Sequence, residues 1–289
     1  MNPLVHGFHH AATGSWTYVV ADPGSHSAAI IDPVLDFDAA SGKLWPEAAR
    51  RIASCLREHE LKVKWILETH AHADHLSAAQ WLKHVVGGQV GIGKDIIEVQ
   101  KRFARLLGFD DTFGTDGNPF DHLFADGESM SIGDLDLRVM ATPGHTPDGV
   151  SYLIGDAIFI GDTLFAPSAG SARCDFPGAD AATLYRSIQR LYAQPDATRV
   201  FLCHNYPPDG AEAICETSIA EQKAHNVHID AHTSEADFVA RRRARDATLS
   251  VPRLLWPALQ VNIRAGALPS SDDAGNRYLR IPLDIAALT

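Results

Sequence analysis

A dense run of metal-binding side chains, Thr69-His70-Ala71-His72-Ala73-Asp74-His75, constrains this sequence more than any other segment. Four potential ligands fall within six residues, directly after the apolar run Trp65-Ile66-Leu67. A strand that ends in a loop can project alternate side chains into one cleft, and imidazole with carboxylate suits zinc, iron or manganese. The alternative is a polar surface loop that is rich in histidine by chance, but such a loop does not require this spacing. The segment therefore predicts a metal site.

Three further loops carry potential ligands, and each follows a run typical of a β-strand. They are Thr142-Pro143-Gly144-His145-Thr146 after residues 135–140, Gly161-Asp162-Thr163 after residues 157–160, and His204-Asn205-Tyr206 after residues 200–202. Ligands that arrive from several strand ends, with glycine permitting tight turns, indicate a site built at one edge of a sheet scaffold.

Short runs typical of β-strands recur along the chain, together with segments whose apolar residues have helical spacing. The predicted strands cover residues 17–20, 28–31, 63–67, 135–140, 150–154, 157–160 and 199–202. The predicted helices cover residues 46–59, 76–84, 95–107, 181–191 and 235–247. The early strands look hairpin-like and the later ones alternate with helices, which favours an α/β fold of two mixed sheets flanked by helices.

No internal repeat, low-complexity tract or long linker divides the sequence, so we expect residues 1–289 to form a single domain. After Val251 the pattern becomes irregular, and prolines interrupt short apolar stretches at Pro252, Pro257, Pro269 and Pro282. We expect the residues from about 251 onward to form a C-terminal tail packed on the main body.

Composition and charge narrow the range of partners. The chain is 45% hydrophobic and 21% charged, as globular proteins are, and its net charge of -11 disfavours nucleic acid or an anionic membrane as a partner. A small-molecule partner fits better. The N-terminal 17 residues lack a secretory signal pattern, and no apolar stretch is long enough to span a bilayer. Four cysteines without Cys-x-x-Cys spacing favour a cytoplasmic protein.

The ligand loops match a known pattern: between about residues 17 and 204 the sequence resembles the metallo-β-lactamase superfamily. This resemblance implies an αββα sandwich of two mixed β-sheets flanked by helices. The seven metal-binding positions of the superfamily correspond, in the family's order, to His70, His72, Asp74, His75, His145, Asp162 and His204.

Within the superfamily, the sequence is most similar to the persulfide dioxygenases, also called sulfur dioxygenases of the ethylmalonic-encephalopathy type. The similarity rests on three short segments: Ile31-Asp32-Pro33-Val34-Leu35, Arg173-Cys174-Asp175-Phe176 and Asn262-Ile263-Arg264-Ala265-Gly266. It implies an iron-dependent dioxygenase that converts glutathione persulfide, O2 and water to sulfite and glutathione.

The resemblance also implies the metal and its ligands. One Fe(II) per chain would be held by His70, His145 and Asp162, a 2-His-1-carboxylate set that leaves open positions for substrate and O2. The remaining superfamily positions would be outer-shell groups or would hold a second metal, namely His72, Asp74, His75 and His204.

Three residues are candidates for contact with the substrate. Tyr206 matches a family tyrosine whose hydroxyl would act in catalysis, although Asn205 stands where the family usually has aspartate. The alternative for Tyr206 is a half-buried packing aromatic. Arg173 would bind a glutathione carboxylate or form a structural ion pair with Asp175, and both stay open. Arg264 is a second candidate for carboxylate binding.

Other conspicuous residues have simpler explanations. Cys174 and Cys203 lie near site residues and could carry a persulfide, but we expect buried, inert thiols. Residues 241–243 with Arg245 are expected to form the solvated face of a helix. We expect His6, His9 and His10 to be frayed surface histidines, because they lie near the chain end and no carboxylate nearby supports a metal site.

Two other functions remain alternatives. A binuclear metallohydrolase of the glyoxalase II type would cleave a glutathione thioester with a zinc-activated hydroxide, and the complete set of seven positions allows it. The segments around Arg173 and Asn262 argue against it. A non-catalytic sensor or binding module would lack some ligands, and none is missing here. The oligomeric state stays open, with a homodimer as one option.

Overall fold

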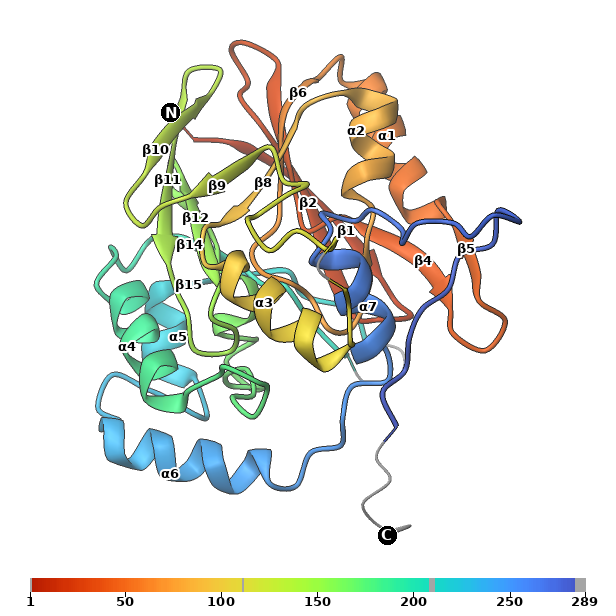
Figure 1. Cartoon of the computed structure of the whole chain (residues 1–289). Coiled ribbons are helices and arrows are strands. Elements are labelled where there is room, and N and C mark those ends of the chain that lie inside the picture. Colours follow the sequence, from red (N-terminus) through yellow and green to blue (C-terminus); the bar gives the residue numbers. More distant parts are fainter. Residues whose placement is uncertain (1, 111, 208–210, 284–289) are drawn as a thin grey trace, which may run out of the picture.

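Two mixed β-sheets lie face to face at the centre of the structure (Figure 1), a computed structural model that describes residues 2–110, 112–207 and 211–283. The first sheet has the order β1 (Leu4–His10), β2 (Ser15–Ala21), β3 (Ser27–Ile31), β6 (Lys62–Leu67), β8 (Gln89–Gly93) and β9 (His122–Phe124). The second has the order β10 (Ser129–Ile132), β11 (Leu135–Ala141), β12 (Val150–Ile154), β13 (Ala157–Phe159), β14 (Arg199–Phe201) and β15 (Glu216–Ser218). A small sheet joins β5 (Lys43–Trp45), β4 (Val34–Asp38) and β7 (Leu76–Ser77).

Two parallel strand pairs determine where the ligand loops meet. In the first sheet β3 and β6 are parallel neighbours, so the residues that follow them, Asp32 and Thr69, emerge at the same edge. In the second sheet β13 and β14 are parallel, while the other described pairs of that sheet are antiparallel. Asp162 and His204 follow this pair and also emerge together.

Helices cover the outer face of each sheet (Figure 1). The first sheet carries α1 (Glu47–Glu58), α2 (Ala79–Val86), α3 (Ile96–Leu106) and α7 (Leu255–Asn262). The second sheet carries α4 (Ala181–Tyr192), α5 (Ile219–His225) and α6 (Glu235–Asp246). Among the described helices, none has the length and apolar character needed to cross a membrane.

The central core fills the space between the two sheets. Tyr18 and Leu67 from the first sheet pack with Tyr152, Phe159 and Phe201 from the second. Strands β2 and β3 are buried along their whole length, because the second sheet covers one face and helices cover the other. Burial on both faces explains why these strands are continuous apolar runs rather than alternating ones.

The α/β architecture predicted from the sequence, with two mixed sheets and flanking helices, is confirmed, and the predicted strands and helices match observed elements to within a few residues. The helix expected from residue 76 begins at Ala79, because residues 76 and 77 pair as β7 with β4. Several strands, β1 among them, and α5 were not predicted, since elements of seven residues or fewer carry little periodicity.

Within the C-terminal segment, residues 255–262 form α7, a helix that the sequence pattern did not predict. Pro257 lies in the first turn of this helix, where the backbone N–H groups have no intrahelical acceptor, so proline is tolerated there. Leu255, Leu259 and Ile263 join the core beneath the first sheet, and Val261 packs with Leu76 in a smaller cluster. This segment therefore packs tightly on the main body.

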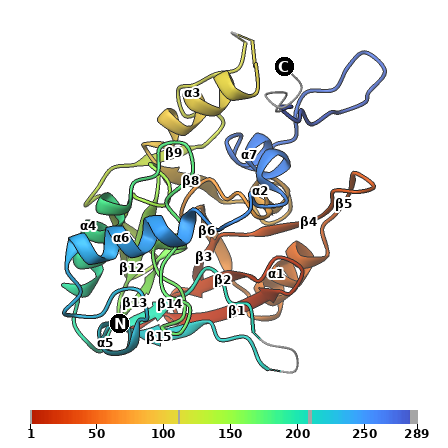
Figure 2. The same cartoon turned by 90° about the horizontal axis from the view of Figure 1, so that it is seen from below.

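The expectation of frayed histidines near the start of the chain is wrong. His6, His9 and His10 belong to β1, which pairs along its full length with β2. His10 has a carboxylate partner, since its Nε2 lies 3.3 Å from Oδ1 of Asp36. The turned view shows β1 running beside α1 (Figure 2), which a sequence pattern could not reveal.

The packing of α7 leads to the first prediction. Leu259 is 3% exposed, so Leu259→Ala should lower the free energy of unfolding by about 2–5 kcal/mol through loss of buried surface and formation of a cavity. The control is Val251→Ala, because Val251 is 66% exposed just before the same helix and should change stability by less than about 0.5 kcal/mol. Chemical denaturation measures both. Equal effects of the two substitutions would contradict this packing.

Candidate metal centre

Two buried carboxylates hold the backbone of the histidine loop (residues 69–75) where it leaves β6. The Thr69 backbone N–H donates to Oδ1 of Asp32 at 2.7 Å, and the Thr69 hydroxyl donates to Oδ2 at 2.8 Å. The Ala71 N–H donates to Oδ2 of Asp148 at 2.8 Å. Both carboxylates are buried, and hydrogen bonds to an ionised acceptor are stronger than neutral ones. The loop is therefore held on both sides before any metal binds.

Asn262, at the end of α7, fixes the remainder of the loop. Its side-chain oxygen accepts a hydrogen bond from the Ser77 N–H at 2.8 Å, and its amide nitrogen donates to the carbonyls of His72 and His75, each at 2.8 Å. The side chain is buried, so these groups replace water as hydrogen-bond partners. The sequence of this segment indicated a family resemblance but not that Asn262 positions the loop.

A glycine lets the aspartate loop approach the histidine loop. Gly161 has a φ of +50°, and a Cβ placed there would lie 2.7 Å from Oγ1 of Thr69. A larger residue would be strained in this conformation and would push the loops apart. The tight turn expected at this position from the sequence is therefore needed to bring Asp162 to the histidines.

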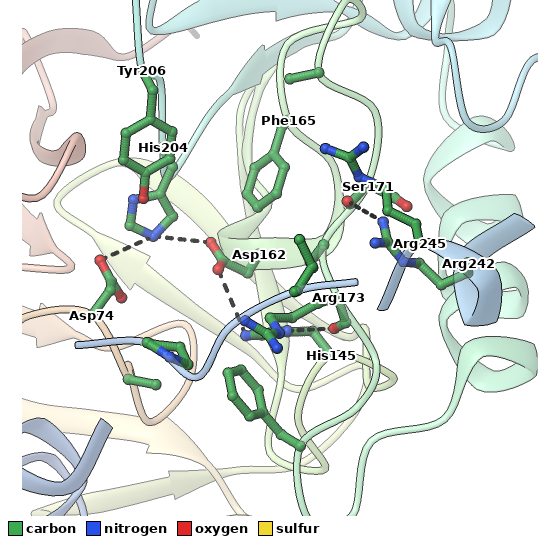
Figure 3. Close-up of a pocket in the computed structure, with 16 residues that line it drawn as sticks. Asp74, His145, Asp162, Phe165, Ser171, Arg173, His204, Tyr206, Arg242 and Arg245 are labelled. Atoms are coloured by element: carbon green, nitrogen blue, oxygen red, sulfur yellow. Dashed lines mark hydrogen bonds and ion pairs between the residues drawn. The ribbon is translucent and has the colours of Figure 1, made fainter. Parts of the chain in front are cut away.

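The structure brings the seven predicted metal positions together. The ligand atoms of His70, His145 and Asp162 lie within 4.8 Å of one another. Nε2 of His145 lies 3.6 Å from Oδ2 of Asp162, and Nε2 of His204 lies 3.2 Å from Oδ1 of the same carboxylate (Figure 3). His204 also lies 3.5 Å from Oδ2 of Asp74. Asp162 is thus the carboxylate shared by both halves of the cluster.

The cluster leaves buried polar atoms without hydrogen-bond partners. They include Nε2 of His70, Nε2 of His75 and Nδ1 of His72. A buried polar atom without a partner costs about 1–3 kcal/mol, and such atoms are rare in folded proteins. Their concentration at one place fits a bound cation, so the residues present suit a metal ion.

Hydrogen bonds to backbone and hydroxyl groups orient two of the imidazoles. Nδ1 of His145 lies 2.7 Å from the carbonyl oxygen of Arg173, which can only accept, so the ring donates from Nδ1 and keeps Nε2 available. Nδ1 of His70 lies 3.0 Å from Oγ1 of Thr69, whose proton already goes to Asp32. Both rings are therefore held in the tautomer that offers Nε2 to a metal.

The protonation states of His70 and Asp162 favour metal binding. Burial and the neighbouring His72 lower the pKa of His70 well below its usual value, so this imidazole is neutral. Burial tends to raise the pKa of Asp162, but the nearby His204, His70 and His145 outweigh it and hold the pKa far below its usual value. Neutral imidazole and ionised carboxylate are the forms that bind metal ions.

The remaining positions form a second group beside the first. The ligand atoms of His72, Asp74 and His75 also lie within 4.8 Å of one another. Nε2 of His72 is 3.0 Å from Oδ1 of Asp32, and the Ser15 hydroxyl donates to Asp74 at 3.1 Å. These contacts fit outer-shell groups and also fit ligands of a second metal.

A cavity of about 340 Å³ opens beside the cluster. Its metal-side wall contains Asp74, His145, Asp162 and His204 (Figure 3). The rest of the lining is mainly apolar, with three arginines, and consists of Ala73, Phe165, Ala169, Ser171, Ala172, Arg173, Phe176, Tyr206, Arg242, Arg245, Leu249 and Pro252. A partly apolar pocket with a few convergent charged groups is typical of a small-molecule site.

The model of the metallo-beta-lactamase superfamily matches residues 11–204, which contain all seven positions of the cluster. The chain belongs to this superfamily. Members of the superfamily bind metal ions, and together with the ligand cluster this makes the chain a metal-dependent enzyme with the superfamily fold.

Relatives within the superfamily have different names. The chain is 46% identical to a probable metallo-hydrolase of Burkholderia pseudomallei, covering 97% of this chain and 99% of that protein. It is 43% identical to glyoxylase B2 of Dictyostelium discoideum, covering 95% and 94%. Identity to the mitochondrial persulfide dioxygenase ETHE1 of Bos taurus is 27%, covering 87% and 84%. Three further relatives at 46% identity are longer, and the chain spans 65% of their length.

Among solved structures, the crystal structure of ETHE1 from Myxococcus xanthus is similar, with a TM-score of 0.73 and 29% sequence identity. The similarity covers 91% of this chain and 100% of that one. The resemblance to the superfamily, and within it to ETHE1 proteins, is therefore confirmed in both sequence and structure.

The two arginines predicted to bind substrate have different positions. Arg173 lines the cavity, but its guanidinium makes two hydrogen bonds of 2.6 Å to Asp175, which is the structural ion pair weighed as its alternative. Arg264 is not brought to the metal cluster. Its guanidinium lies 4.4 and 4.6 Å from the ring centres of Phe109 and Phe113, beside a different cavity.

The prediction that residues 241–243 and Arg245 form a solvated face is wrong for Arg242. This side chain is 3% exposed, forms an ion pair of 2.7 Å with Asp246 and donates to the carbonyl of Ser171 (Figure 3). Arg245 is exposed and lines the cavity of the metal centre. The i,i+4 spacing of Arg242 and Asp246 was a sequence signal for a pair, but not for its burial.

Tyr206 and the two cysteines have the following environments. Tyr206 lines the cavity, is 69% exposed, and its ring lies parallel to that of His204 at 6.0 Å. Gly14 makes room for it, because a Cβ there would lie 2.3 Å from the Tyr206 ring. Burial raises the pKa of the Cys174 and Cys203 thiols, which fits the expectation of inert side chains.

The hydrogen bonds of Asn262 lead to the second prediction. Asn262→Ala removes three buried hydrogen bonds of the histidine loop, so it should lower the free energy of unfolding by about 1–3 kcal/mol and also lower the metal content. Gln260→Ala is the matched control, because this buried amide on the same helix bonds to Trp256 and Arg280 instead. The control should lose stability but keep its metal. Metal loss in both variants, measured by elemental analysis, would contradict a specific role of Asn262.

Proposed function

We propose that this protein is a persulfide dioxygenase that converts glutathione persulfide, O2 and water to sulfite and glutathione, with one Fe(II) per chain. The observation that carries the proposal is the group of His70, His145 and Asp162, whose ligand atoms lie within 4.8 Å of one another beside the arginine-lined cavity. Two imidazoles and one carboxylate are typical of non-haem Fe(II) oxygenases with open coordination positions. The similarity to ETHE1 proteins supports the same assignment.

An iron ion held by these residues would supply the redox chemistry between the persulfide sulfur and O2, while the chain supplies placement. Phe165, Phe176 and Leu249 give the cavity apolar surface, which favours the soft, weakly hydrated persulfide over water. We assign Tyr206 the role of a hydrogen-bond donor to the substrate, because its side chain lines the same cavity.

Arg245 is the group we assign to the carboxylates of the carrier. Glutathione persulfide is anionic and the protein has a net charge of -11, so binding requires local positive charge. Arg173 is paired with Asp175 and Arg242 with Asp246. In the described part of the chain Arg245 has no acidic partner, and it lies on the cavity wall. A free guanidinium can bind a carboxylate through two parallel hydrogen bonds.

A thioester hydrolase is the second candidate, and two observations favour it. His72, Asp74 and His75 form a further group with ligand atoms within 4.8 Å, and His204 lies between Asp74 and Asp162. Two zinc ions bound by these groups would generate a hydroxide nucleophile. Relatives named metallo-hydrolase and glyoxylase, at 46% and 43% identity, are more similar in sequence than the dioxygenase relative.

The third prediction separates the ligands from the surrounding groups. Alanine at His70, His145 or Asp162 should abolish both iron content and oxygen uptake with glutathione persulfide, because each removes one of three protein ligands. Alanine at Asp74 or His204 should reduce metal affinity or activity by about 10- to 100-fold. Elemental analysis and an oxygen electrode measure the two properties on protein purified without oxygen.

The same preparations distinguish the two functions. The wild type should contain one iron per chain and consume O2 only when glutathione persulfide is supplied. Two metals per chain, hydrolysis of a glutathione thioester and no oxygen uptake would reject the dioxygenase and support the hydrolase.

The fourth prediction concerns Arg245. Arg245→Ala should raise KM for glutathione persulfide about tenfold with little change in kcat, since one charge-assisted hydrogen bond contributes ~1.4 kcal/mol to binding. Arg243→Ala is the control, because Arg243 is exposed on the same helix and does not line the cavity. With a small persulfide that lacks carboxylates as the substrate, neither substitution should change KM. An unchanged KM for the Arg245 variant would remove the assignment.

A further inference from the structure

A further group of metal-binding side chains lies outside the seven-residue cluster, on β1 and α1. These two elements run side by side (Figure 2). It consists of His6 on β1, Cys55 in the last turn of α1, and His59 at the C-cap of α1. Their ligand atoms lie within 4.8 Å of one another. Cys55 and His59 have i,i+4 spacing and so share one face of the helix, while the pairing of β1 with β2 holds His6 opposite them.

The three ligand atoms are available to a metal. Within the described ranges, no hydrogen bond reaches the ring nitrogens of His6 and His59 or the thiol of Cys55. The Cys55 side chain is buried at 9% exposure, so water does not fully solvate the thiol. The two imidazole rings lie 4.7 Å apart with an interplanar angle of 32°, which brings two nitrogen ligands close together.

We infer that His6, Cys55 and His59 form a zinc-binding site that ties β1 to α1. One thiolate and two imidazoles are ligands that zinc prefers, and water completes a tetrahedral shell in a site with three protein ligands. On binding, the Cys55 thiol releases its proton to solvent and its sulfur donates a lone pair to the cation, with no redox change. The site joins an edge strand to the helix covering its sheet, so zinc adds a cross-link between secondary-structure elements.

Cobalt(II) is the probe, because a thiolate bound to cobalt gives a near-ultraviolet charge-transfer band that histidine and carboxylate ligands do not give. The full-length protein, with its catalytic site already loaded with iron and kept under anaerobic conditions, is titrated with cobalt and then with zinc. The wild type should gain the band and lose it again when zinc displaces cobalt. Zinc should also raise the melting temperature of the wild type, since a ligand that binds only the folded state stabilises it.

Variants decide whether this cluster is the origin of the band. Cys55→Ser and His59→Ala should abolish both the band and the zinc-dependent rise in melting temperature, whereas Cys215→Ser, which alters a partly buried cysteine outside the cluster, should keep both. His59 is exposed, so its substitution tests the site even if Cys55→Ser fails to fold. A wild type without the band, or a band that survives His59→Ala, would overturn the inference. Iron content and oxygen uptake should be unchanged in the His59 variant, which separates this site from the catalytic one.

Discussion

The hydrogen bonds from Thr69 to the buried carboxylate of Asp32 fix the start of the histidine loop, and the geometry of the metal centre depends on them. Because the Thr69 hydroxyl proton goes to Asp32, the oxygen accepts from Nδ1 of His70 and leaves Nε2 of that ring for the metal. One carboxylate therefore sets both the backbone of the loop and the tautomer of a ligand. Although burial opposes it, His72 keeps the pKa of Asp32 below its usual value, so the acceptor stays charged.

The fold delivers these groups to one place through two of its parallel strand pairs. In the first sheet β3 and β6 bring Asp32 and the histidine loop to one edge, and in the second sheet β13 and β14 bring Asp162 and His204 to an edge that faces it. Helix α7 then closes the loop from outside through Asn262, which binds two carbonyls of the loop. Distant parts of the chain thus hold the histidine loop by its backbone, which keeps its ligands organised despite unpartnered nitrogens.

Features carried by local pattern could be predicted from the sequence, whereas those created by packing could not. The ligands were predictable because His70, His145, Asp162 and His204 each follow an apolar strand, where chain direction determines where a side chain points. Helix α7 was missed because a proline within it, Pro257, argues against a helix, although Pro257 lies in the first turn, where proline is tolerated. Arg242 was expected in solvent because it belongs to a highly charged helix. The sequence pattern of that helix does not indicate that the loop containing Ser171 covers this one arginine.

The position of Asp162 explains how the same set of metal-binding residues is compatible with a dioxygenase and with a hydrolase. Its Oδ2 faces His145 and its Oδ1 faces His204, so the carboxylate can bind one metal while His204 holds its second oxygen, or it can bridge two metals. All seven superfamily residues can therefore be present in a one-iron enzyme, where His204 and Asp74 would orient the ligand instead of binding a metal. Ligand identity alone cannot separate the two functions. The lining of the cavity bears on this difference, because it contains apolar rings and Arg245, which has no acidic partner in the described part of the chain.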